Sequence, residues 1–181
     1  KAPVKVVTKA GTTSAVLTWS KSTDARGYRI YVKNNGRWKA IKTVTATTYT
    51  VTALSPGRTY EFSIKAYTKV GSKTVWSPSY TQFSILTKPE APELRLASTA
   101  KGRVTIAWGD VEGETGYQIW YSTKKNGTYK KMSNCTADTI KVYKNGLASG
   151  RVYYFKMRAY QKTASGYVYS SFSSVKSVKI K

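Results

Sequence analysis

The sequence predicts an all-β protein built from two β-sandwiches in tandem. Three observations lead to this prediction. The sequence repeats itself once, each copy consists of short stretches that alternate apolar with polar residues, and Gly, Asn, Ser or Pro separate these stretches. Alternation at period two places every second side chain on the same face of a strand. Seven short strands per copy, with turns every roughly 8 to 12 residues, are typical of a sandwich.

The internal repeat defines the domain organisation. Residues 16–32 match residues 105–121, and residues 54–69 match residues 147–162. The offset between the copies grows only in turn-like stretches, where two versions of one fold tolerate insertions. The composition changes at the segment LTKPEAPE, whose two prolines indicate a short, stiff linker. We therefore expect one domain over residues 1–87, a linker over residues 88–91 and a second domain over residues 92–181.

Alternation identifies strands along both copies. In the first copy the clearest stretches are AVLTWS at 15–20, YRIYVK at 28–33 and YEFSIKAY at 60–67, and in the second VYYFKMRAY at 152–160. They are rich in Val, Ile, Thr and Tyr, which favour strands. The stretches KNNG, SPG and KVGSK between them supply turn residues, and no stretch has a helical apolar stripe with caps.

Motifs within these strands resemble those of a fibronectin type III domain. Trp19 lies on the second strand, Gly-Tyr-x-Ile opens the third, and Leu-x-x-Gly-x-x-Tyr leads into the sixth, with counterparts in the second copy. The resemblance implies an immunoglobulin-like sandwich of seven strands, with Trp19 and Trp108 in the cores and Tyr60 and Tyr153 as tyrosine corners. The sequence of the two copies is most similar to the lysine- and tyrosine-rich fibronectin type III domains on secreted and surface proteins of Gram-positive bacteria. The resemblance therefore implies an extracellular or cell-surface location.

Composition excludes several kinds of chemistry. The chain has no histidine and one cysteine, Cys135, which excludes Cys/His zinc sites, Ser-His or Cys-His catalysis and an internal disulfide. The acids Asp110, Glu112 and Glu114 cluster in one loop but offer too few oxygens for calcium, so a solvated loop is expected. Cys135 aligns with Val44 and is expected to be buried. The sequence therefore predicts no catalytic residue, cofactor or metal, and not an enzyme.

Charge suggests one class of partner. The chain has 31 Lys or Arg and 8 Asp or Glu, a net charge of +23, and the excess is spread over both copies. Such a field attracts polyanions, among them anionic cell-wall polymers and, at low salt, nucleic acid without sequence preference. Lysines also simply keep a surface soluble. No apolar run approaches the roughly 20 residues that cross a bilayer, so we expect no membrane insertion, and we expect a monomer.

Aromatic residues provide the candidate ligand-binding set. Tyr28, Ile30 and Val32 share one face of their strand, and the resemblance to the family makes that face the inner one, so alternation points Tyr31 outward. The same rule, applied to both copies, gives a repeated outward set with interleaved lysines. Flat rings flanked by cations can stack on sugars or bases, or they can pack against each other and the lysine stems to stabilise the sheet. The second use is the more common. The candidate residues are Tyr31, Trp38, Lys65, Tyr67, Trp76, Trp120, Tyr129, Lys156, Tyr160 and Tyr169.

These observations leave three functional hypotheses. The first is a non-catalytic extracellular spacer, stalk or interaction scaffold within a larger surface or secreted protein, which could also contact a host or surface protein. The second is a module that binds an anionic cell-wall polymer or another glycan through the basic, aromatic faces. The third is charge-driven binding of nucleic acid or a heparin-like polyanion.

Overall fold

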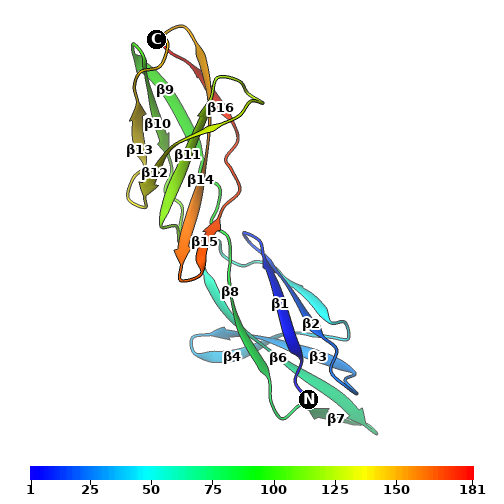
Figure 1. The fold of residues 1–181 in the computed structure, drawn as a ribbon. Helices are drawn as coiled ribbons and strands as arrows, with labels where there is room; N and C mark the ends of the chain where they lie inside the picture. Colours follow the sequence, from blue (N-terminus) through cyan, green and yellow to red (C-terminus); the bar gives the residue numbers. More distant parts are fainter. The chain divides into compact units, whose positions relative to one another are not determined.

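The computed structural model describes residues 1–181 and consists of strands, turns and loops without a helix. The chain divides into two compact units, Lys1–Thr87 and Lys88–Lys181 (Figure 1). Each unit pairs a three-stranded sheet with a five-stranded one, and every ladder between neighbouring strands is antiparallel. The predicted all-β fold with two sandwiches is confirmed. The structure contains no helix of the length and apolarity needed to cross a bilayer.

The first unit contains eight strands in two sheets. The smaller sheet has the order β1-β2-β5, and the larger has the order β4-β3-β6-β7 with β8 also paired to β6. The strands are β1 (Val4–Ala10), β2 (Ala15–Ser20), β3 (Gly27–Asn34), β4 (Arg37–Val44), β5 (Thr48–Val51), β6 (Thr59–Val70), β7 (Lys73–Trp76) and β8 (Thr81–Leu86).

The second unit repeats this topology. Its smaller sheet has the order β13-β10-β9, and its larger sheet has the order β12-β11-β14-β15 with β16 also paired to β14. The strands are β9 (Leu94–Ala100), β10 (Arg103–Trp108), β11 (Gly116–Ser122), β12 (Lys130–Thr136), β13 (Lys141–Lys144), β14 (Val152–Thr163), β15 (Gly166–Tyr169) and β16 (Lys176–Lys179).

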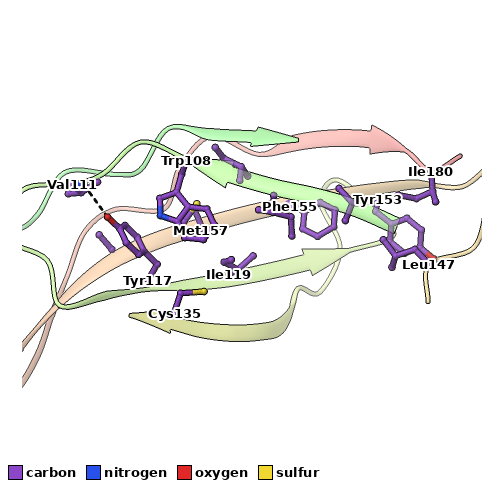
Figure 2. Packing of buried hydrophobic residues seen from close by; sticks show 14 residues of the cluster. Trp108, Val111, Tyr117, Ile119, Cys135, Leu147, Tyr153, Phe155, Met157 and Ile180 are labelled. Carbon is purple, nitrogen blue, oxygen red and sulfur yellow. Dashed lines mark hydrogen bonds between the residues drawn. The ribbon is translucent and has the colours of Figure 1, made fainter. Parts of the chain in front are cut away.

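Each unit has its own hydrophobic core, formed by the apolar positions of the alternating strands. The predicted core tryptophans are confirmed, since Trp19 is 3% exposed and Trp108 is 4% exposed. Trp108 packs edge-on against Tyr117, with ring centroids 5.2 Å apart. Figure 2 shows Trp108 between the sheets, and it shows the hydroxyl of Tyr117 accepting a hydrogen bond from the backbone N–H of Val111 at 3.0 Å. Rings of this size contribute much of the buried apolar area of a small domain.

Both predicted tyrosine corners form. The hydroxyl of Tyr60 accepts a hydrogen bond from the backbone N–H of Ser55 at 2.7 Å. The hydroxyl of Tyr153 accepts one from the backbone N–H of Ala148 at 3.2 Å. Each bond fastens the loop before the long central strand to that strand, and it satisfies a backbone donor outside the sheet ladders.

The last of the seven predicted strands is divided in both units, which produces the pairs β7 and β8, and β15 and β16. In the first unit the division begins at Ser77. Its backbone N–H donates to the carbonyl of Ala66 at 2.8 Å, and its Oγ accepts from the N–H of Ala66 at 3.3 Å. Ser170 and Ser173 make the same pair of bonds to β14. Serine hydroxyls thus replace backbone carbonyls where the strand leaves the ladder.

Candidate ligand-binding surfaces

All ten candidate residues lie half-buried on or beside the larger sheet of their unit. None belongs to either hydrophobic core. The expected outward direction therefore holds, but these side chains are also partly covered. What covers each ring decides whether it can contact a ligand, and the covering groups differ along the sheet and between the units.

Tyr67 and Trp76 pack against each other in the first unit, and both also line a surface cleft of about 400 Å³. They lie directly opposite each other on β6 and β7, with ring centroids 5.2 Å apart and planes tilted by 56°. The guanidinium of Arg29 lies 4.5 Å from the centroid of the Trp76 ring. Arg29 is held there because its Nε donates a hydrogen bond to Oγ1 of Thr43 at 3.0 Å. This end of the sheet is a packed cluster of rings and cation.

Tyr31, Trp38 and Lys65 surround an open cleft at a different place on the same sheet. Its other walls are Ser63 and Tyr80, and its volume is about 180 Å³. The rings of Trp38 and Tyr80 have centroids 6.4 Å apart and planes tilted by 58°. We call this feature the Trp38 cleft. The four aromatic residues predicted in the first unit therefore fall into two separate groups and do not form one stripe.

An ion pair supports one side of the Trp38 cleft. The ammonium of Lys33, directly opposite Trp38 in the ladder, lies 5.8 Å from the ring centroid. The same Nζ lies 2.7 Å from Oε2 of Glu61 on β6. Both partners are well exposed, so this pair contributes little stability, but it occupies one of the two acids of residues 1–87.

The equivalent face of the second unit is closed by a lysine. Nζ of Lys156 lies 4.4 Å from the ring centroid of Tyr129 and 4.4 Å from that of Phe172. The ring of Phe172 also meets Trp120 edge-on at 6.1 Å. Because the lysine fills the space between the two rings, these candidates pack against each other here.

Arg158 continues this packing along β14. Its guanidinium lies 3.6 Å from the ring centroid of Tyr169, and its Nε and Nη2 donate to Oε1 of Gln118 at 3.0 and 2.9 Å. Tyr160 lies beside Tyr169, with centroids 6.3 Å apart. Burial raises the pKa of the Tyr160 hydroxyl, which keeps it neutral.

Several members of these clusters were not among the predicted residues. Tyr80 and Phe172 lie where the last strand is interrupted, and alternation does not define a direction there. Arg29 and Arg158, by contrast, lie on strands at the same outward parity as Tyr31 and Tyr160. Parity alone is therefore sufficient to place both arginines on the outward face.

The acidic loop and the cysteine have structural surroundings. Oδ1 of Asp110 accepts a hydrogen bond from the hydroxyl of Tyr117 at 3.1 Å. Burial raises the pKa of Glu114. The expected burial of Cys135 is confirmed, at 8% exposure, and desolvation raises the pKa of its thiol, which disfavours the nucleophilic thiolate.

Comparison with known proteins gives three findings. The fibronectin type III domain family matches residues 2–83. The chain is 34% identical over 177 residues to Chitinase A1 of Niallia circulans, covering 92% of this chain and 24% of that protein. It is 28% identical over 158 residues to Exoglucanase B of Cellulomonas fimi, covering 81% of this chain and 14% of that protein. The chain thus spans about a quarter or less of these relatives.

Among solved structures, a segment of two fibronectin type III domains from chicken tenascin has the same fold. It is similar with a TM-score of 0.59 and 15% sequence identity, and the match covers 99% of each chain. At this identity the likeness concerns the fold alone.

Proposed function

Since the chain belongs to the fibronectin type III family, as two such domains in tandem, we propose that it is a non-catalytic spacer in a larger extracellular protein that acts on a polysaccharide. One observation carries the proposal. Nearly all of this chain, 92% and 81%, aligns with small parts, 24% and 14%, of a chitinase and an exoglucanase. The match leaves most of each relative outside the aligned part. Because a shared fold does not by itself bring a catalytic site, this proportion supports an accessory role for the chain.

The packing of the outer faces supports a spacer role. Most candidate rings are covered by other rings or by a cation, as Tyr129 is by Lys156 and Tyr169 by Arg158. Covered rings stiffen a sheet and offer little area to a ligand. We further propose the limits 1–87 and 92–181 for the two domains, with residues 88–91 as the proline-containing connection between them.

The spacer role is tested by grafting. The 181-residue chain is placed between a chitinase catalytic domain and a chitin-binding domain, and it is compared with a Gly/Ser linker of equal extended length. We expect equal hydrolysis of soluble oligosaccharides, because the catalytic domain is unchanged. We expect insoluble chitin to be hydrolysed faster by the fusion that contains the chain than by the fusion with the Gly/Ser linker. A flexible linker lets the catalytic domain collapse onto the chitin-binding domain, whereas a stiff spacer keeps it free to reach the polymer around the anchoring point.

The matched control is an unrelated tandem of two fibronectin type III domains, which should serve as well as this chain. If the Gly/Ser linker performs equally on insoluble chitin, the spacer proposal is wrong. If only this chain accelerates hydrolysis, it acts through binding and not through spacing.

Polyanion binding is a second candidate, favoured by the charge. With 31 basic and 8 acidic residues, most cations lack an acidic partner, and both units carry the excess. We expect weak retention on teichoic acid, heparin and DNA alike, falling steeply as salt is raised, because counterion release drives such binding. Retention that persists at high salt, or that differs strongly among the three polymers, would contradict a purely charge-driven interaction.

A further inference from the structure

The Trp38 cleft owes its existence to one small residue. In the first unit Ser63 lies opposite Tyr31 in the β3–β6 ladder. In the second unit the same register position, opposite Trp120, is occupied by Lys156, whose stem and ammonium fill the space between two rings. The two units therefore present the same sheet face in two forms, closed in the second and open in the first.

The lining of the Trp38 cleft carries two polar groups. Ser63 is 3% exposed and lines the cleft, so its hydroxyl belongs to the cleft floor. The ammonium of Lys65, also in the lining, has neither a hydrogen bond nor an ion pair. A serine hydroxyl can donate and accept a hydrogen bond, and an ammonium donates up to three, so both groups can bind a polar ligand that enters the cleft.

The walls of the cleft select the shape of that group. The volume of about 180 Å³ is smaller than the roughly 300 to 1,000 Å³ of pockets that enclose drug-sized ligands, and it suits a single six-membered ring. Trp38 and Tyr80 are tilted by 58°, so a flat base cannot lie parallel to both. A pyranose presents C–H groups on its faces and edges, and hydroxyls around its rim, so it can contact tilted rings and Ser63 together.

Charge selects the substituent. Residues 1–87 contain two acids, Asp24 and Glu61, and Glu61 is engaged by Lys33 at 2.7 Å. No acid lines the cleft, so Lys65 lacks a counter-charge. We infer that the Trp38 cleft is a subsite for one pyranose residue that carries a carboxylate, with the rings contacting the sugar and Lys65 the carboxylate. This assignment goes beyond the spacer role, since a spacer needs no ligand.

The test uses the whole 181-residue chain and three probes. Methyl glucuronide represents the proposed ligand, methyl glucoside the same ring without charge, and a thymidine hexanucleotide the competing class of ligand. Binding is followed by the NMR signal of the Trp38 indole N–H. We expect a saturable shift with the glucuronide, weaker binding of the glucoside and no saturable shift with the oligonucleotide.

The sharpest variant is Ser63→Lys, which copies the closed arrangement of the second unit. It adds a positive charge, so non-specific attraction of anions would increase, whereas a filled cleft should bind the glucuronide about tenfold or more weakly. Tyr80→Ala removes one wall at a residue that is 47% exposed and should weaken binding with little effect on the melting temperature. Lys65→Met should remove the preference for glucuronide over glucoside.

Three results would overturn the inference. These are the absence of a saturable shift at Trp38, glucuronide binding by the Ser63→Lys variant that equals or exceeds that of the parent chain, and a shift caused by the oligonucleotide that Ser63→Lys abolishes. The last would make the cleft a base-binding site. Failure here leaves the spacer role standing, because the grafting experiment measures hydrolysis of an uncharged polymer.

Discussion

Tyr67 lies across Gly27. The two residues are paired on β6 and β3, and a Cβ added to Gly27 would stand 2.7 Å from Cε1 of the tyrosine ring. Tyr160 and Gly116 repeat this relationship in the second unit. An aromatic ring over a strand glycine supplies the packing that glycine lacks. Two of the ten candidate residues therefore have a structural role that is independent of any ligand.

Gly27→Ala is expected to destabilise the first unit by about 1 to 3 kcal/mol, because the new methyl group meets both the ring of Tyr67 and the carbonyl of Val44. Urea unfolding of the chain measures this. Gly109→Ala is the matched control, since nothing lies within 4 Å of its added Cβ. If both variants changed the free energy of unfolding by the same amount relative to the parent chain, the close approach at Gly27 would not be a constraint.

Trp108→Ala should cost about 3 to 5 kcal/mol, and Trp19→Ala the same, because each removes the largest ring of a core. Trp108→Phe should cost clearly less, since the indole Nε1 of Trp108 is buried without a hydrogen-bond partner and its loss breaks no bond. Chemical unfolding followed by near-UV circular dichroism compares the variants. A Phe variant as unstable as the Ala variant would point to a polar role for the indole.

Tyr153→Phe should lower the free energy of unfolding by about 0.5 to 1.5 kcal/mol, the usual net contribution of one hydrogen bond. The change removes only the hydroxyl that accepts from Ala148. Tyr143→Phe, at an exposed tyrosine whose hydroxyl makes no hydrogen bond, is the control and should be neutral. The corner would be unimportant if both variants unfolded at the urea concentration of the parent chain.

Arg158→Lys should be destabilising by about 0.5 to 2 kcal/mol although it keeps the charge, because an ammonium cannot stack on Tyr169 and hold Gln118 through two donors. A double-mutant cycle with Gln118→Ala separates the two contributions. If Arg158→Lys is neutral, the cluster on β14 is held by charge alone.

The second unit should lose stability in mild alkali through Cys135. Burial raises the pKa of this thiol in the folded state above its unfolded value. The protonated thiol therefore makes its full contribution to stability below the ordinary thiol pKa of about 8.5. The contribution is lost as the pH rises through the folded pKa. Cys135→Val, which copies Val44 of the first unit, should flatten the fall in stability above the ordinary thiol pKa of about 8.5. Parallel pH profiles for the two chains would disprove the assignment.

The sequence was sufficient for the features that depend on local patterns. Trp19, Trp108 and the two corner tyrosines occupy motif positions within alternating strands, and the resemblance to the fibronectin type III family implied their burial or bonding. The grouping of the outer rings did not follow. A register shift between Ile30 and Tyr31 changes which residues of β4 they meet, and the interrupted last strand brings Tyr80 to Trp38. Both depend on backbone irregularities that alternation does not encode.

The division of the last strand also affects the risk that strands of the two similar units pair with each other. In a tandem of two similar sandwiches, each edge strand of one sandwich is held at high effective concentration near the matching edge strand of the other. This proximity favours misassembly. β7 spans only Lys73–Trp76, and Pro78, just beyond it, has no N–H to offer an incoming strand. Ser77, Ser170 and Ser173 already use their backbone N–H groups and hydroxyls within their own unit. The break therefore shortens the edge strand that is available for pairing, and it protects the two-domain chain against aggregation.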